Sequence, residues 1–236
     1  MKLVVQLNSV IRQLEALAEP EKVCFKEKKF GIVANNSLGI YQQDLKLLAR
    51  EIGPNNELAL QLYATGIYEA RLLCCRLYDP KLITRTQMNK WAADFENWEI
   101  CDSFCMGFFT KSRYAIEKAR QWSKSNTEFT KRAAFTIMAS YGFADKQADN
   151  KVFEQFFPLI ERAATDQRIY VKKAVNWALR SIGKRNVDLQ SSAIEIARHL
   201  LLLEDKTANW IAKDALRELQ NPKVCVLDYP RTIYRA

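Results

Sequence analysis

The chain has 236 residues, of which 48% are hydrophobic, and a formal net charge of +9. Enough apolar side chain is present to bury a substantial core, which excludes a largely disordered chain, and the longest apolar run, at 199–203, is too short to cross a bilayer. The positive charge indicates a polyanionic partner, with nucleic acid favoured over an anionic membrane surface, and we expect an intracellular, cytoplasmic protein.

Only seven glycines and six prolines interrupt the chain, and alternating strand patterns are nearly missing, which predicts an all-α protein. Periodicity and capping residues predict helices over 3–17, 44–52, 57–64, 68–78, 84–93, 96–109, 113–123, 127–141, 151–164, 168–182, 191–203 and 206–219. Glu19-Pro20, a Lys-rich stretch and Gly31 predict a turn and loop over 18–37. We expect a single monomeric domain with a divergent N-terminal cap at 1–37, repeats at 38–220 and an irregular tail at 221–236.

An internal repeat relates these short helices. The segment 129–135 matches 170–176 at an offset of 41, and a looser echo, 210–213, follows 40 residues further on. These spacings fall in the range of HEAT and armadillo repeats, in which each unit is an antiparallel helix pair. The sequence therefore predicts an α-solenoid of HEAT-like repeats.

The repeat also predicts where positive charge gathers, because equivalent positions of successive repeats line the same surface. Arg132, Lys173 and Lys213 are equivalent, so we expect them to form one column on a basic concave face that binds the DNA backbone. Further cations are expected beside or along this column: Lys131, Lys172 and Arg180. The alternative is that these are ordinary solvated charges on helix surfaces.

Metal chemistry is not expected. The six cysteines have no C-x-x-C spacing, and Cys101 and Cys105 are two thiols without companion ligands, so most cysteines are better interpreted as small core residues. The single histidine, His199, excludes multi-histidine sites.

Two tryptophans are candidates for a cleft. Trp98 precedes Asp102 by four residues, so both project from one face of a predicted helix, and Trp177 follows Lys173 by four residues. If these faces meet, they form a cleft with two indole walls and one carboxylate. Burial of both tryptophans in the core is the alternative.

The motifs Trp98-Glu-Ile-Cys-Asp102, Lys131-Arg132-Ala-Ala and the segment from Val171 to Arg180 resemble the AlkD-like DNA alkylation-repair family of HEAT-like DNA glycosylases. The likeness extends over 38–220. It implies that Trp98 and Trp177 are the paired cleft tryptophans, that Asp102 is the catalytic aspartate, and that Arg132 contacts the DNA backbone.

The resemblance implies hydrolysis of the N-glycosidic bond of cationic alkylated purines, N3-methyladenine and N7-methylguanine, in damaged double-stranded DNA. It implies that the base is not flipped and that no metal or other cofactor is needed. Asp102 and the indole faces would stabilise the positive charge that develops on the deoxyribose.

Lesion-excising members carry a second full helix in the first repeat, where this sequence predicts the loop at 18–37. The chain thus also resembles a branch that lacks this N-terminal recognition element. We favour a glycosylase over a non-catalytic protein that binds altered or branched DNA, and both over a HEAT scaffold for an acidic protein.

Overall fold

The computed structural model describes residues 2–234, and every regular element in that range is a helix, which confirms the all-α prediction. The chain divides into two compact units, Met1–Phe108 and Phe109–Ala236, which are described separately below. The expectation of a single monomeric domain stays a prediction. Among the described residues no helix combines the length and apolarity that crossing a membrane requires.

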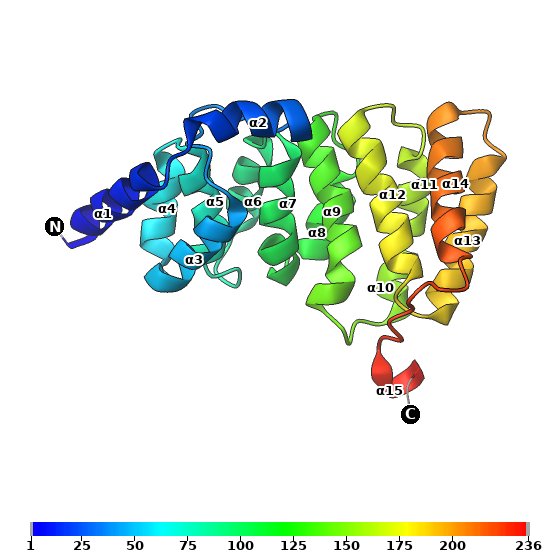
Figure 1. The fold of residues 1–236 in the computed structure, drawn as a ribbon. Helices are drawn as coiled ribbons and strands as arrows, with labels where there is room; N and C mark the ends of the chain where they lie inside the picture. Colours follow the sequence, from blue (N-terminus) through cyan, green and yellow to red (C-terminus); the bar gives the residue numbers. More distant parts are fainter. Residues whose placement is uncertain (1, 235–236) are drawn as a thin grey trace. The chain divides into compact units, whose positions relative to one another are not determined.

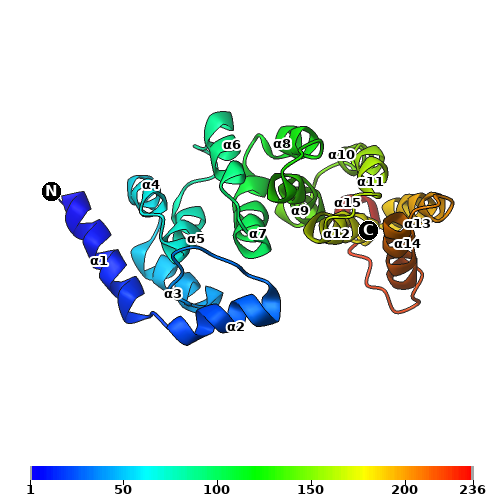
Figure 2. The same cartoon turned by 90° about the horizontal axis from the view of Figure 1, so that it is seen from above.

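The described part of the first unit consists of helices joined by connecting segments. Its helices are α1 (Lys2–Ala16), α2 (Pro20–Phe30), α3 (Gln42–Ile52), α4 (Asn56–Ala64), α5 (Tyr68–Leu77), α6 (Arg85–Ala93) and α7 (Trp98–Gly107). Within this unit α4 and α6 lie in one layer and α5 and α7 in the other (Figures 1 and 2). The core between them is aromatic, since the ring of Trp91 lies 5.5 Å from that of Phe104 and 5.8 Å from that of Phe108.

The second unit has the two-layer arrangement more regularly. Its elements are η1 (Phe109–Lys111), α8 (Ala115–Trp122), α9 (Glu128–Ala144), α10 (Asn150–Glu154), α11 (Phe157–Ala163), α12 (Ile169–Gly183), α13 (Val187–Leu201), α14 (Lys206–Leu219) and α15 (Arg231–Tyr234). One layer holds α9, α12 and α14 side by side, and the other holds α8, α11 and α13 (Figure 2). This is the helix-pair pattern that the repeat predicted.

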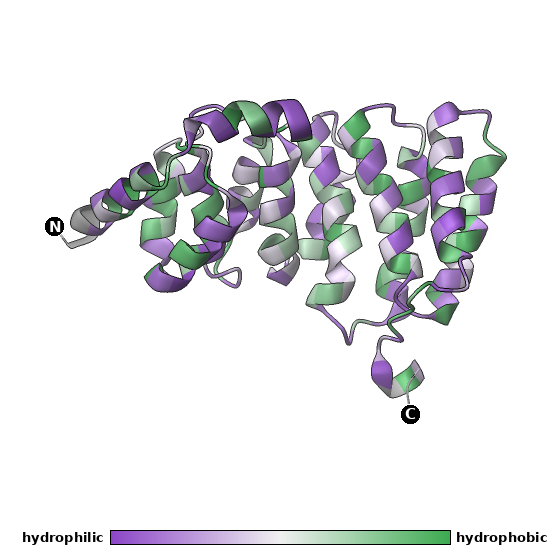
Figure 3. Ribbon diagram, viewed as in Figure 1, coloured by the Kyte–Doolittle hydropathy of each residue, from purple (hydrophilic) through white to green (hydrophobic). Residues whose placement is uncertain are grey.

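Figure 3 shows hydrophobic and hydrophilic residues mixed along the described helices of each unit. Close packing in the second unit depends on Gly183, because a Cβ there would lie 2.9 Å from the side chains of Ala193 and Leu219. The side-chain-free position lets α12 approach α13 and α14.

The prediction of a loop over 18–37 is wrong, because residues 20–30 form helix α2. Pro20 occupies the first turn of the helix, where no backbone N–H donor is needed. Gly31 is left-handed, with φ of 65°, and its N–H bonds the Glu27 carbonyl, so it ends the helix. The residues taken as helix breakers therefore mark the two ends of a helix.

The single helix predicted over 151–164 is also wrong. It is divided into α10 and α11, with Pro158 in the first turn of α11. Proline in the middle of a continuous helix would lack its N–H donor and clash with the preceding turn, so the chain restarts there. In contrast, α13 begins four residues earlier than the predicted start at 191, because Asn186 caps it by accepting from the Leu189 N–H at 3.0 Å.

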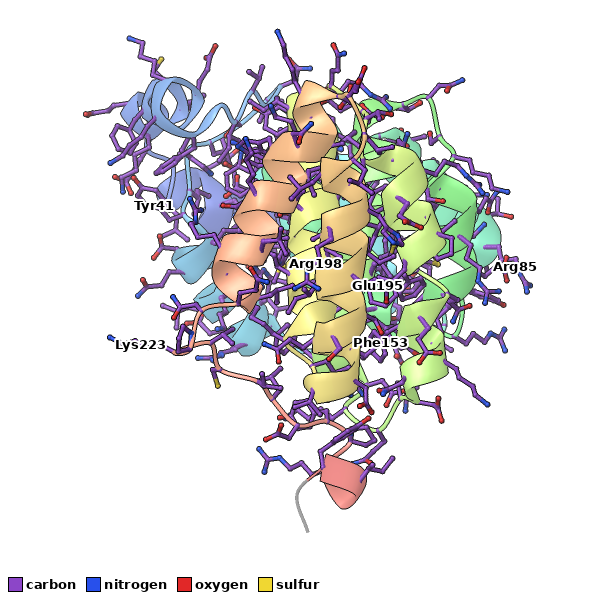
Figure 4. All side chains as sticks on the ribbon, turned by 90° about the vertical axis from the view of Figure 1, so that its right-hand side faces the viewer. Tyr41, Arg85, Phe153, Glu195, Arg198 and Lys223 are labelled. Carbon is purple, nitrogen blue, oxygen red and sulfur yellow. The ribbon has the colours of Figure 1, made fainter. Side chains whose placement is uncertain are left out.

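The tail after α14 returns to the second unit. The N–H groups of Leu227 and Tyr229 donate to the carbonyls of Lys184 and Arg185 at 2.9 and 3.0 Å. The buried Arg185 guanidinium donates in turn to the carbonyls of Gly142 and Ala148, at 2.9 and 2.8 Å. The tail is therefore tied to the α9–α10 connection, while Lys223 extends outward from it (Figure 4).

Candidate nucleic-acid interface

The predicted pair Trp98 and Asp102 lies on α7 in the first unit. Asn97 begins this helix, since its side-chain oxygen accepts from the N–H groups of Glu99 and Ile100 at 2.9 and 3.2 Å. Trp98 is the first helical residue and Asp102 lies one turn later, so both share a face, and both are partly exposed. The indole Nε1 of Trp98 donates to the carbonyl oxygen of Phe30 at 2.9 Å. Helix α2 thus fixes the orientation of this tryptophan.

A buried polar cluster beneath Trp98 holds α2 against α5 and α7. The Lys26 ammonium, on α2, lies 3.1 Å from the Glu99 carboxylate, and both residues are buried. The Tyr68 hydroxyl oxygen lies 3.0 Å from both Asn97 Oδ1 and Glu99 Oε2, and its single proton can be donated to either oxygen. Burial raises the pKa of Tyr68 far above its usual range, and the Glu99 carboxylate raises it further, so the phenol stays a donor.

A second carboxylate fixes the segment that follows α2. Glu69 is fully buried and accepts from the Leu38 N–H and the Ser37 hydroxyl, both at 2.8 Å, and from the Gly39 N–H at 3.0 Å. Gly39 has φ of +81°, and a Cβ there would lie 2.2 Å from the Glu19 carbonyl oxygen. The segments before and after α2 are therefore held by these contacts, and they fix the position of α2 beside Trp98.

Trp177 lies on α12 in the second unit and is partly exposed. Lys173 precedes it by one turn and is exposed, and Arg180 follows on the same face. Arg180 is paired with Glu218 on α14, and its Nε lies 3.6 Å from an Asp214 carboxylate oxygen. Because Trp98 and Trp177 belong to different units, the cleft that they were predicted to share stays a prediction.

Arg132, which was predicted to share one column of positive charge with Lys173 and Lys213, is buried. This residue is 6% exposed, and its guanidinium donates to the carbonyl oxygen of Tyr170, in the first turn of α12, at 2.8 Å. The equivalent position on α12, Lys173, is exposed. Repeat equivalence predicts the direction of a side chain, whereas its exposure depends on what the neighbouring helix covers.

Lys131 also interacts with another residue of the protein, through an ion pair. Its ammonium lies 2.9 Å from the Asp166 carboxylate, which Arg168 contacts at 2.6 Å. Burial alone would raise the pKa of Asp166, but hydrogen bonds from Arg168 and Lys131 outweigh it and hold that pKa well below the usual range. Lys131 is thus neutralised by a carboxylate that stays ionised.

Lys172, Lys173 and Lys213 differ from the cations described so far. They form no ion pair with any residue that the structure describes, and Lys173 and Lys213 are exposed. The ammonium of Lys172 lies 5.2 Å from the ring centroid of Trp210, which is 41% exposed. The sequence prediction missed Trp210, although it lies three residues before Lys213 in the same repeat alignment.

The remaining candidate residues lie apart from these surfaces. Cys101 and Cys105 are buried in α7, and His199 on α13 is exposed, 3.8 Å from a Glu161 carboxylate oxygen. Within residues 2–234 no group of three or more histidine, cysteine or acidic side chains is placed to hold a metal ion.

Comparison with known proteins adds a family and a fold. A solved structure described as "a new family of proteins related to the HEAT-like repeat DNA glycosylases with affinity for branched DNA structures" is 21% identical, with a TM-score of 0.71 over 89% of this chain and 94% of that chain. No curated protein matches the sequence. The family model described as "DNA alkylation repair enzyme" matches residues 10–219. The chain therefore belongs to the DNA alkylation repair enzyme family.

Proposed function

We propose that the protein binds damaged double-stranded DNA and releases cationic alkylated purines, N3-methyladenine and N7-methylguanine, by hydrolysing the N-glycosidic bond. The observation that carries this proposal is the pair on α7: Trp98 and Asp102 lie one turn apart, and the Trp98 indole is fixed by the Phe30 carbonyl. A carboxylate beside a fixed aromatic face suits a reaction that builds positive charge on the sugar.

The proposed reaction needs no metal and no flipped base. Alkylation has already made the base a good leaving group, so the bond between C1′ and the base nitrogen breaks and its electron pair leaves with the base. Asp102 stabilises the resulting oxocarbenium-like sugar and positions a water. That water forms the new bond to C1′, and its proton passes to the carboxylate. The proposal also assigns the ring face of Trp98, whose N–H is bonded to the Phe30 carbonyl, to the same cationic centre.

Helix α2 supports this proposal. The sequence predicted a loop where lesion-excising relatives carry a helix, whereas residues 20–30 are helical and anchored beside Trp98 through Lys26 and Phe30. A helix at this position is what an excising protein of this family would carry, so it supports the proposal.

The cations of the second unit support DNA as the partner. Lys173 and Lys213 are exposed and form no ion pair with the described residues, so their charge is available to phosphates. The protein's net charge of +9 acts in the same direction.

A second candidate is a non-catalytic protein that binds altered or branched DNA. The observation that favours it is Arg132, expected at the DNA backbone but buried and bonded to the Tyr170 carbonyl. The solved relative with affinity for branched DNA is in keeping with this alternative.

Base release by wild type and by Asp102→Asn separates the two candidates. DNA containing N7-methylguanine or N3-methyladenine is incubated with each protein at matched occupancy, and the freed base is measured. Excision by wild type that is lost in the variant, with binding unchanged, supports the glycosylase. Equal binding by both proteins with no freed base supports the second candidate.

A further inference from the structure

Three aromatic residues occupy equivalent positions in the layer formed by α9, α12 and α14. Phe129, Tyr170 and Trp210 follow one another at offsets of 41 and 40, and each lies three residues before Arg132, Lys173 or Lys213. The three helices lie side by side within the second unit (Figure 2). We call Phe129, Tyr170 and Trp210 the aromatic row.

The contacts in this row leave its last member open. The rings of Phe129 and Tyr170 pack against each other, with centroids 5.3 Å apart, and both residues are partly buried. Trp210 is 41% exposed and has the Lys172 ammonium 5.2 Å from its ring centroid. An exposed tryptophan alone is ordinary on a protein surface, but one at the end of a periodic aromatic row with a cation over its ring is a more specific arrangement.

Charge is uneven along the same helices. Toward the C-terminal ends of α12 and α14, Arg180 and Lys184 both form ion pairs with the Glu218 carboxylate. Toward Trp210 the surface carries Lys172, Lys173 and Lys213, and none of these three forms an ion pair with a residue in the described part of the chain. This half of the layer combines an exposed indole with three lysines that no described carboxylate pairs.

The surface of α13, in the layer that also holds α8 and α11, carries both signs of charge. On α13 the exposed residues Glu195 and Arg198 carry opposite charges on one face (Figure 4). A mixed-charge face of this kind is typical of a solvated helix surface and gives no net attraction for a polyanion.

We propose that the exposed end of the aromatic row, Trp210 with Lys172, Lys173 and Lys213, binds unpaired nucleotides of DNA. A base stacks on the open indole face while the lysines contact the flanking phosphates. Aromatic side chains bind bases of any sequence in this way, because every base has a stacking face. This proposal rests on the DNA binding proposed above and adds a contact that excision at Asp102 does not require.

The preference for unpaired nucleotides follows from access. In an intact duplex each base face is covered by its neighbours, so a surface tryptophan meets only sugars and phosphates. At a branch point, gap or single-stranded end the base faces are open and stack on an aromatic ring. The lysines contact phosphates in intact duplex and in DNA with unpaired nucleotides. Trp210 adds binding free energy only to the DNA with unpaired nucleotides, because only there can a base stack on its ring.

The test measures the affinity of the full chain for three labelled DNAs of equal length: an intact duplex, the duplex with a single-stranded gap, and a single strand. Trp210→Ala is expected to weaken binding to the gapped and single-stranded DNAs about tenfold. Its duplex affinity is expected to change less than twofold. Trp210→Phe keeps an aromatic face and should retain most of the affinity.

Phe143→Ala is the matched control, because Phe143 is an aromatic residue of the same unit with 56% exposure that lies outside the row. It should leave all three affinities unchanged, and thermal melting checks that each variant is folded. An equal loss on all three DNAs, or no loss with Trp210→Ala, overturns the proposal. Duplex binding and base release by wild type report separately on the proposed function, so failure of one proposal is distinguishable from failure of the other.

Discussion

The indole nitrogen of Trp98 donates a hydrogen bond to the carbonyl of Phe30, 2.9 Å away, and so joins the first residue of α7 to the last residue of α2. This bond links the candidate site to a helix that the sequence alone did not predict. It makes the position of α2 and the orientation of the tryptophan depend on each other.

Trp98→Phe tests this dependence, because it removes the donor but keeps an aromatic face. We expect faster amide hydrogen exchange in residues 20–30, with a loss of about 1 kcal/mol in the free energy of unfolding. Trp210→Phe serves as the control, since Trp210 lies in the other unit. Unchanged exchange across α2 in Trp98→Phe would show that this hydrogen bond does not hold the helix.

Glu99→Ala should be strongly destabilising, by about 3–5 kcal/mol, because it leaves the buried Lys26 ammonium without its carboxylate partner. The double variant Lys26→Met with Glu99→Leu removes both charges and should recover much of this loss. Chemical denaturation of Lys26→Met, Glu99→Leu and the double variant measures the coupling between the two charges. Additive losses in the double variant would mean that the two charges do not stabilise each other.

Asp166→Asn is predicted to lower the free energy of unfolding by about 1–3 kcal/mol at neutral pH, through loss of its charge-assisted bonds to Arg168 and Lys131. Because the folded-state pKa of Asp166 lies below its unfolded value, the carboxylate stabilises the fold above the unfolded pKa, about 3.9. This contribution declines as the pH falls below that value. Urea denaturation of both proteins between pH 7 and 3 should therefore show their difference narrowing below about pH 4, and a constant difference would contradict the account.

Arg132 and Lys213 should respond differently to substitution, although the repeat makes them equivalent. Arg132→Ala removes a buried guanidinium that bonds Tyr170, so it should lower stability. Lys213→Ala should leave stability unchanged and reduce the slope of log affinity against log salt by about one unit, as expected for one lost phosphate contact. Exposed Lys151, on α10, is the control for the second variant. A reduced salt slope in folded Arg132→Ala would instead assign Arg132 to the DNA contact.

The sequence was sufficient to predict those parts of the fold that depend on the local periodicity and spacing of residues. The all-α class, the helix pairs of the second unit and the shared face of Trp98 and Asp102 follow from periodicity and spacing, and the structure has each of them. The errors arose where tertiary contacts decide. Pro20 and Gly31 are compatible with either a loop or the two ends of a helix, and only packing through Lys26 and Phe30 selects the helix.

The solvent exposure of individual side chains also could not be predicted from the sequence repeat. Arg132 and Lys173 are equivalent in the repeat, but Arg132 is buried on α9 and bonded to the Tyr170 carbonyl, whereas Lys173 is exposed on α12. The same alignment contained Phe129, Tyr170 and Trp210, and only the structure distinguishes the packed first pair from the open last ring.

The most direct test of the proposed function is release of N3-methyladenine by the wild-type protein in a single turnover, with protein in excess so that all DNA is bound. The account predicts base release well above the spontaneous depurination of the same DNA without protein. Release at the spontaneous rate, while a binding assay shows the DNA fully bound, would contradict it and leave the protein as a DNA-binding relative of the glycosylases.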